Sequence, residues 1–262
     1  AGTAGCGITD QICDAVFHSG VDKDAARKQF WLVDRNGLLV SDQADLVEFQ
    51  KPYARDRSEL SDWDVKDQSN ITLAEVVSHV KPTILIGCST VHGAFTEEIV
   101  KDMCAHCDVP IIMPLSNPTS KSEAEPKDLI HWSDGKALVA AGSPFDPVDY
   151  KGRKIRISQG NNAFVFPGLG LGVIASKAKR MSDKMIIAAA NSLSSCSPMR
   201  KDKDAPMLPD FDVIQEVQEK VALAVAEQAR SEGLAGVDAK CDLKDEVKRH
   251  IWKPLYHKYV AG

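Results

Sequence analysis

The stretch Pro110-Ile111-Ile112-Met113-Pro114-Leu115-Ser116-Asn117-Pro118-Thr119 passes from a short apolar run directly into polar residues. The run from Ile111 to Leu115 is bounded by proline and is typical of a buried parallel strand. Asn117 is then expected at the carboxyl end of that strand, where open α/β sheets bind their ligands. Its uncharged amide can donate to a carboxylate and accept from a hydroxyl, which suits a small polar acid. The alternative is a polar turn in which Asn117 only caps the residues that follow.

Further apolar runs of strand length lie on both sides of this stretch, separated by segments with helical periodicity. The runs are Phe30 to Val33, Thr83 to Gly87 and Ala137 to Ala140. One intervening helix is expected from Thr96, as its cap, to about Cys107. Strand and helix therefore alternate four times, which predicts an α/β fold with a Rossmann-type, doubly wound parallel sheet.

The chain begins with the glycine-rich segment Ala1-Gly2-Thr3-Ala4-Gly5-Cys6-Gly7 and continues into apolar residues at helical spacing. This pattern is typical of a phosphate loop that opens a helix, with the pyrophosphate on the free amides of the helix start. Gly2 and Gly5 correspond to the second and third glycines of G-x-G-x-x-G, so Gly2, Thr3, Ala4 and Gly5 are expected to bind a dinucleotide. The first glycine and first strand would precede Ala1, so we expect a piece of a longer polypeptide. The alternative is a flexible glycine-rich terminus.

Two charged residues follow the run from Phe30 to Val33, at the turn Asp34-Arg35-Asn36-Gly37. The Asp34 carboxylate can accept hydrogen bonds from both ribose hydroxyls of a dinucleotide, which favours NAD. The Arg35 guanidinium could instead bind a 2′-phosphate and favour NADP, and otherwise it is a solvated turn residue. The small residues Gly87, Cys88 and Ser89 after the next strand would let the backbone approach the cofactor.

The last hundred residues are predicted to be helical. Gln159-Gly160-Asn161-Asn162 places two adjacent amides just before this region, so we divide the chain into a dinucleotide-binding domain over 1–162 and a helical region over 163–262. Three glycines at alternate positions, Gly168, Gly170 and Gly172, indicate a helix start in tight packing contact. Ser182 and Asp210 are expected to cap two long helices. Aromatic residues in the tail are expected to dock on the fold: Trp252, Tyr256 and Tyr259.

Composition excludes several classes of protein. The chain has 262 residues, 44% hydrophobic content and a net charge of -5, which allows a buried core and offers no concentrated basic face for nucleic acid. No apolar segment is as long as a membrane span, and no signal sequence precedes the first helix. Seven irregularly spaced cysteines indicate reduced thiols. We expect a soluble cytoplasmic protein, or a mitochondrial matrix protein in a eukaryote, without nucleic-acid or membrane partners.

Five motifs occur in a single order along the chain: Leu32 to Leu38, Lys81 to Gly87, Ser116-Asn117-Pro118-Thr119, Gly142-Ser143-Pro144-Phe145-Asp146-Pro147 and Gln159-Gly160-Asn161-Asn162. In this order they resemble the carboxyl-terminal half of malic enzyme, in particular its bacterial-type NAD-linked branch. The resemblance covers nearly the whole chain, and five motifs in register are highly specific. It implies the oxidation and decarboxylation of L-malate to pyruvate and CO2 with NAD or NADP and a divalent metal, Mg or Mn.

The resemblance also implies roles for individual residues. Asn117 and Asn162 would hold malate near the nicotinamide, with Asn161 beside that contact and Asn117 also touching the cofactor. The cofactor would be held by Gly2, Thr3, Ala4, Gly5, Asp34, Arg35, Gly87, Cys88 and Ser89. The general base, the acid and the metal ligands of the family precede the dinucleotide loop, so no catalytic or metal-binding residue is assigned to this chain, and we expect it to be inactive alone.

Other implications concern partners. The helical region would pack partly on the missing amino-terminal half, so we expect exposed apolar surface between Phe164 and about Arg230, and a homo-oligomer. Two alternatives stay open. One is malolactic enzyme, which converts malate to lactate and CO2, and the other is a non-catalytic nucleotide-binding or assembly module.

Overall fold

A computed structural model of the chain describes residues 1–252 and Tyr256. The chain forms two compact units, one of Ala1–Asn161 with Lys201–Leu208 and the other of Asn162–Arg200 with Pro209–Gly262. Each unit has its own hydrophobic clusters.

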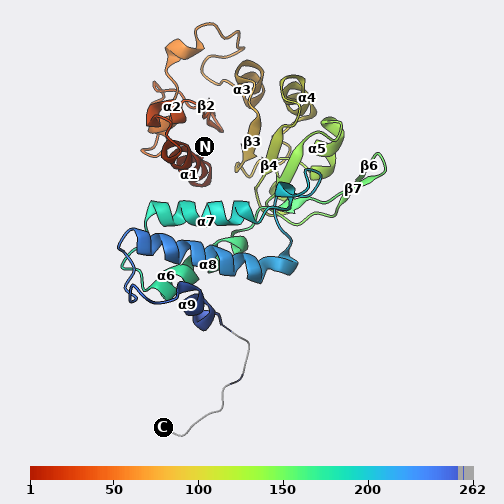
Figure 1. Ribbon diagram of the computed structural model, residues 1–262. Helices are drawn as coiled ribbons and strands as arrows, with labels where there is room; N and C mark the ends of the chain where they lie inside the picture. Colours follow the sequence, from red (N-terminus) through yellow and green to blue (C-terminus); the bar gives the residue numbers. More distant parts are fainter. Residues whose placement is uncertain (253–255, 257–262) are drawn as a thin grey trace. The chain divides into compact units, whose positions relative to one another are not determined.

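The first unit is built on a four-stranded parallel sheet in the order β3-β4-β5-β8, of which Figure 1 labels β3 and β4. Its strands are β3 (Ile84–Gly87), β4 (Ile111–Pro114), β5 (Leu138–Ala141) and β8 (Ser158–Gln159). The parallel α/β architecture and the strands expected at 83–87, 111–115 and 137–140 are confirmed. Burial of the strands is less complete than the apolar runs suggested, because β3 is an edge strand of this sheet. Its residue Ile84 is 51% exposed.

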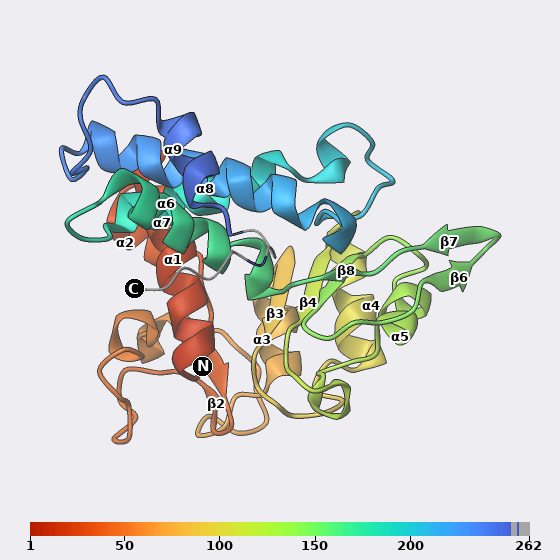
Figure 2. The ribbon, with the colours of Figure 1, turned by 90° about the horizontal axis from the view of Figure 1, so that it is seen from below.

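Helices connect the parallel strands and cover the sheet, as Figure 2 shows for α4 and α5 beside β4. They are α3 (Leu73–Val80), α4 (Glu97–His106) and α5 (Pro126–Trp132). The Thr96 side chain accepts a hydrogen bond from the Ile99 amide, so the expected cap is confirmed. Met103 and Ile112 are completely buried between helix and sheet, which fixes how the strands are covered.

The segment from Phe30 to Asp34 does not join the parallel sheet. Only β1 (Val33–Asp34) is a strand, and it pairs antiparallel with β2 (Gly37–Leu38) across the expected turn. The prediction of a full parallel strand at 30–33 was therefore wrong. The physical reason is local: Leu32 is buried in a small cluster with Cys6, and its carbonyl accepts from the Leu39 amide.

The rest of the first unit consists of short elements. The glycine-rich start is already helical from Thr3, since α1 spans Thr3–His18, so Gly5 lies inside the helix and not in a preceding loop. The sequence did not reveal the next helix, α2 (Lys23–Arg27), which Asp22 caps. Short 3₁₀ helices follow: η1 (Lys51–Tyr53), η2 (Arg57–Leu60) and, after β4, η3 (Thr119–Lys121).

A hairpin of β6 (Val148–Tyr150) and β7 (Arg153–Ile155) connects β5 to β8. It projects beyond the parallel sheet in Figure 2. Residues 201–208 also belong to this unit. Arg153 forms an ion pair with Asp204 at 3.0 Å, and the Leu208 amide donates to Ser158 Oγ at 3.1 Å. A late segment thus returns to the sheet, which the sequence did not indicate.

The second unit is helical. Its helices are α6 (Phe166–Ser176), α7 (Asp183–Ser195), α8 (Ile214–Ser231) and α9 (Leu243–His250), with short 3₁₀ turns at η4 (Asn162–Phe164), η5 (Pro198–Arg200) and η6 (Phe211–Val213). Ser182 caps α7 as expected, whereas Asp210 caps η6 immediately before α8. Met185, Val217 and Val221 are buried at the centre of this unit.

Helices α6 and α8 approach each other closely at two glycines of α6, in agreement with the predicted packing. A Cβ atom on Gly172 would lie 2.5 Å from the Ala222 carbonyl oxygen, and one on Gly168 would lie 2.7 Å from the Gln218 carbonyl oxygen. Gly170 faces open space. The alternating glycines therefore serve helix packing on one face only.

Replacing Gly172 with Ala should lower the free energy of unfolding by about 2 kcal/mol, because the added methyl group collides with the α8 backbone. Replacing Gly170 with Ala should raise it by about 0.5 to 1 kcal/mol, because alanine favours the helix and meets no neighbour. Urea unfolding followed by circular dichroism measures both. Equal effects of the two substitutions would contradict this packing.

Exposed apolar side chains occur in the second unit, as expected for Phe164 to Arg230. Phe166 is 71% and Ile174 is 60% exposed, although Phe164 itself is buried. In the tail, Trp252 is 81% exposed and Tyr256 is fully exposed, so the prediction that these aromatics dock was wrong. Tyr259 lies outside the described residues. In the part of the chain that the structure describes, no helix is long and apolar enough to span a bilayer.

Candidate functional site

The loops after β3, β4 and β5 lie together at one edge of the parallel sheet. The Leu115 amide donates to the Gly87 carbonyl at 2.9 Å, and the Gly142 amide donates to the Pro114 carbonyl at 3.0 Å. These bonds continue the strand pairing into the loops. The predicted residues Gly87, Cys88 and Ser89 therefore stand beside the loop that carries Asn117, at the carboxyl ends of the strands.

The Asn117 side chain is exposed at this edge, and its amide is held in one orientation. Ser143 Oγ, from the buried start of the loop after β5, donates to Asn117 Oδ1 at 2.5 Å. Nδ2 makes only a long contact of 3.4 Å with the Leu115 carbonyl, which engages at most one of its two hydrogens. The amide therefore presents a donor to a ligand, while Ser143 occupies one of the two lone pairs of its oxygen.

Glu123 is a completely buried carboxylate beneath the loops after β3 and β4. Its Oε1 accepts from the Ser89 amide at 2.7 Å, from Ser89 Oγ at 2.8 Å and from Ser116 Oγ at 2.6 Å. Burial raises the pKa of Glu123, but the hydrogen bonds from Ser116 and Ser89 together outweigh burial and hold it below its ordinary value. The side chain is therefore ionised at neutral pH.

Replacing Glu123 with Gln should lower the free energy of unfolding by about 2 kcal/mol at pH 7, because charge-assisted hydrogen bonds are lost. Since folding lowers the pKa of Glu123, the stabilisation is fully present above its ordinary value of 4.5 and is lost as the pH falls through the lowered pKa. Urea unfolding of both proteins between pH 7 and pH 3 measures this. A difference that stays constant or grows toward pH 3 would disprove the assignment.

Glycine is required at the ends of two strands for contacts within the protein. A Cβ atom on Gly87 would lie 2.6 Å from the Glu123 side chain, and one on Gly142 would lie 2.1 Å from the Leu115 carbonyl oxygen. The absence of a side chain at Gly87 was predicted to let the backbone approach a cofactor. The structure shows that this position admits the Glu123 carboxylate.

The thiol of Cys88, between Gly87 and Ser89, is partly buried. Burial, and next the nearby Glu123 carboxylate, raise the pKa of Cys88. It is therefore a neutral thiol at physiological pH. In this state it contributes packing at the loop and no charge.

Asp34 lies at the end of β1, and its carboxylate is fixed by two donors. The Arg35 amide donates to Oδ1 at 2.8 Å, and Gln50 Nε2 donates to Oδ2 at 2.9 Å. Gln50 also donates to the Ala1 carbonyl at 2.8 Å, so it links Asp34 to the residue that precedes the α1 start. The structure thus brings together the residues that were predicted to bind the ribose and the pyrophosphate. The Arg35 side chain is exposed beside them.

The first turn of α1 offers the backbone amides of Thr3, Ala4 and Gly5, which have no partner within the helix. The space around Gly2 and Gly5 is open, since a Cβ atom on either would meet nothing within 4 Å. The Tyr53 hydroxyl donates to Asp10 at 2.6 Å and holds α1 against the loop that contains Gln50. A helix start with free amides and open space suits a phosphate group.

Asn161 and Asn162 follow β8 at the boundary between the two units. Asn161 is the last residue of the first segment of one unit, and Asn162 begins η4 of the other. Asn161 is partly buried and Asn162 is exposed. The expected meeting of Asn162 with Asn117 stays a prediction.

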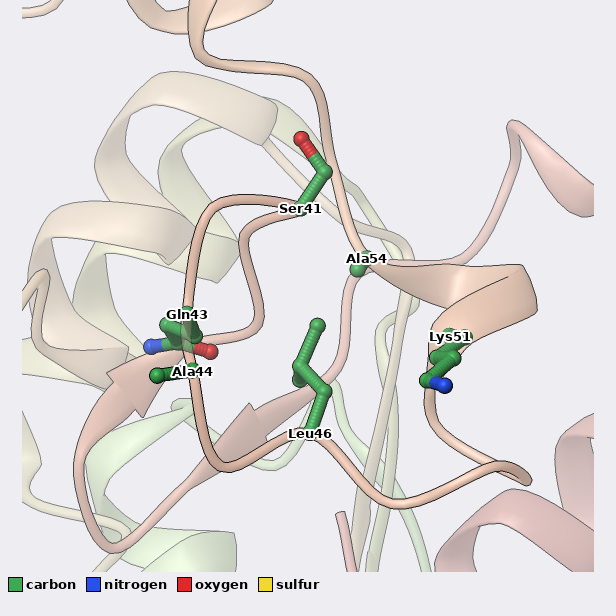
Figure 3. A pocket seen from close by; sticks show the side chains of 6 residues that line it. All are labelled: Ser41, Gln43, Ala44, Leu46, Lys51 and Ala54. Carbon is green, nitrogen blue, oxygen red and sulfur yellow. The ribbon is translucent and has the colours of Figure 1, made fainter.

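A cavity of about 310 Å³ lies in the loop after β2, lined by Ser41, Gln43, Ala44, Leu46, Lys51 and Ala54 (Figure 3). The Gln43 amide is already used, because it accepts from the Val40 amide and donates to the Leu38 carbonyl, both at 3.2 Å. The cavity lacks the convergent polar groups seen at the sheet edge. We therefore place the candidate site at the strand ends and not in this cavity.

Three residues of the candidate site were missed by sequence reasoning. Gln50, Glu123 and Ser143 act on Asp34, on the two loops and on Asn117 respectively. Glu123 lies in the charged segment Lys121-Ser122-Glu123-Ala124-Glu125, which looks like a solvated turn. Ser143 lies within one of the five motifs, in which nothing marks its hydroxyl as a partner of Asn117. No periodicity marks such residues, because their partners are distant in sequence.

Sequence comparison supplies the family context for this geometry. Residues 1–230 match the family described as malic enzyme, NAD binding domain. The chain is 48% identical over 259 residues to an NAD-dependent malic enzyme of Photorhabdus laumondii, covering 99% of this chain and 46% of that protein. An NAD-dependent malic enzyme of Proteus mirabilis is 47% identical over the same coverage. The chain thus spans about half the length of these relatives.

Solved structures share the fold. A malic enzyme of Entamoeba histolytica superposes with a TM-score of 0.62 at 23% identity, over 84% of this chain and 42% of that one. A malic enzyme of Pyrococcus horikoshii gives a TM-score of 0.57 at 24% identity, over 81% and 42%. At these identities the likeness establishes the fold alone.

Proposed function

Because the chain belongs to the malic enzyme family, whose NAD-binding domain it matches, we propose that it forms the cofactor-binding part of an enzyme that oxidatively decarboxylates L-malate to pyruvate and CO2. The observation that carries this proposal is the exposed Asn117 amide, fixed by Ser143 at the carboxyl ends of parallel strands. A fixed uncharged donor at this position suits a dicarboxylate substrate next to a nicotinamide ring.

The described residues fit a dinucleotide. The open start of α1 at Gly2 to Gly5 would hold the pyrophosphate, and the Asp34 carboxylate would accept from the adenosine ribose. Residues 87–89 would contact the middle of the cofactor. NAD, when bound, supplies the acceptor for the hydride that leaves malate. The residues of this chain bind and orient the two reactants for that transfer.

Asn117, Asn161 and Asn162 would bind the substrate, with Asn117 Nδ2 donating to a malate oxygen. Mg or Mn is implied by the family resemblance. Within 1–252 and Tyr256, no three His, Cys, Asp or Glu side chains form a metal-binding group. The base, the acid and the metal ligands would come from another part of the intact protein.

The test is turnover by the intact protein with L-malate, Mg²⁺ and NAD. We expect NADH, pyruvate and CO2 in equal amounts, and no turnover by the 262-residue chain alone. Lactate without net NADH would instead identify a malolactic enzyme. NAD binding without turnover of malate would favour a non-catalytic nucleotide-binding module, and absence of both would leave only an assembly module. Either result would refute the proposal.

We expect NAD to be preferred over NADP, because the fixed Asp34 carboxylate would repel a 2′-phosphate. Replacing Asp34 with Asn should lower the ratio of kcat/KM for NAD to that for NADP by about tenfold. The matched control replaces its exposed neighbour Arg35 with Ala and should leave the ratio unchanged. A ratio that follows Arg35 and not Asp34 would reverse the assignment.

A further inference from the structure

Glu123 connects two loops that carry different parts of the candidate site. The loop after β3 contributes Ser89, through both its amide and its hydroxyl, and the loop after β4 contributes the hydroxyl of Ser116. All three donors reach the same carboxylate oxygen. The other oxygen, Oε2, accepts from the Ser116 amide at 3.3 Å. The carboxylate thus satisfies four donors from two separate segments.

The backbone on either side of Glu123 strengthens this link. The Phe95 amide donates to the Glu123 carbonyl at 3.0 Å, and the His92 ring lies 3.1 Å from the Ser122 carbonyl. The Thr90 amide donates to Ser116 Oγ at 2.9 Å, although Thr90 is in the left-handed region at φ 58°. A β-branched residue rarely adopts that conformation unless surrounding contacts impose it.

We propose that Glu123 is a positioning residue, which sets the loop of Gly87 to Ser89 and the loop of Asn117 at the spacing that NAD and malate require. This inference rests on the proposed function. Glu123 is completely buried and its carboxylate is bonded to Ser89 and Ser116, so it would act on the two reactants through those residues.

A carboxylate is the side chain that this position requires. An apolar residue would leave four buried or partly buried donors without an acceptor, which is costly. A glutamine has one accepting oxygen, and its NH2 group would face a donor at Oε2 or Oε1. A side chain at residue 87 would displace the carboxylate, since a Cβ there would lie 2.6 Å from it. Gly87 and Glu123 are therefore a matched pair.

The experiment compares the intact protein with the variant Glu123→Gln and with the control Ser133→Ala. Ser133 is equally buried in the same unit, but its hydroxyl bonds only to the α5 end and the Ala137 amide. Calorimetry gives the dissociation constants of NAD and of AMP. AMP would reach Asp34 and the start of α1 but not the loop of Gly87 to Ser89, so a merely structural defect would weaken both ligands alike.

We expect Glu123→Gln to weaken NAD about tenfold while leaving AMP within about twofold, and Ser133→Ala to change neither. Hydrogen exchange should quicken at the amides of Ser89 and Ser116 in the Glu123 variant. If Glu123→Gln weakens NAD and AMP binding equally, the positioning role is refuted. It is also refuted if the amides of Ser89 and Ser116 exchange faster while NAD binding is unchanged.

The hydrogen-exchange measurement needs no ligand, so it separates the two proposals. If the wild-type protein does not bind NAD, the proposed function fails, whereas exchange still reports whether Glu123 holds the loops. If Glu123→Gln does not fold, Ser116→Ala removes the hydroxyl between the loops and retains the carboxylate. Folded Ser116→Ala with wild-type NAD affinity and wild-type exchange would refute the inference.

Discussion

Replacing Asn117 with Asp should reduce kcat/KM for malate about a thousandfold in the intact protein. The two side chains have the same shape, and Ser143 Oγ can still donate to the oxygen that it contacts at 2.5 Å. The substitution therefore changes only the Nδ2 position of the side chain. It replaces the Nδ2 donor by an oxygen with negative charge, which repels a dicarboxylate and cannot donate to it.

The control for the Asn117 variant is Asn191→Asp, which makes the same chemical change on the exposed surface of α7. It should leave kcat/KM unchanged. Steady-state kinetics with malate varied at saturating NAD measures both variants. If the Asn117 variant retains kcat/KM within threefold of the wild type, Asn117 does not bind the substrate.

Replacing Gly142 with Ala should lower the free energy of unfolding by about 2 to 3 kcal/mol and also reduce turnover of malate. The new Cβ atom would lie 2.1 Å from the Leu115 carbonyl oxygen and 2.9 Å from Asn117 Nδ2. The loop after β4 must therefore move, and it carries the Asn117 donor with it. The same steric clash is therefore expected to lower both stability and substrate binding.

Urea unfolding and kinetics on the same preparation test this expectation. Gly7→Ala, within α1, is the control, because its Cβ atom would meet nothing within 4 Å and alanine favours a helix. It should not lower stability. A Gly142 variant as stable and as active as the wild type would show that the loops after β4 and β5 are not packed as described.

Three of the four parallel strands could be predicted from the sequence, because β3, β4 and β5 are short apolar runs that end in small or polar residues, whereas β8 is the polar pair Ser158–Gln159. β4 and β5 follow this pattern closely, and the Thr96 cap marks the helix between β3 and β4. The strand expected before Asp34 failed for a different reason. Leu32 is apolar because it fills a local cluster, and an apolar run alone does not show which neighbour it packs against.

The supporting residues of the site were beyond sequence reasoning. Asn117 could be predicted because it follows a strand directly, whereas Ser143 acts on it from 26 residues away. Gln50 donates to Asp34 from 16 residues further along the chain. The sequence around Glu123 is typical of an exposed turn, but the folded chain buries this side chain completely. Burial and long-range hydrogen bonds, which decide these roles, appear only when distant segments are brought together.

The most direct test of this account is a crystal structure of the intact protein with NAD and oxalate, a dicarboxylate that cannot undergo the reaction. We expect oxalate within hydrogen-bonding distance of Asn117 Nδ2, with the adenosine ribose on Asp34 and the pyrophosphate at the start of α1. Both ligands bound away from the carboxyl ends of β3, β4 and β5 would contradict the account.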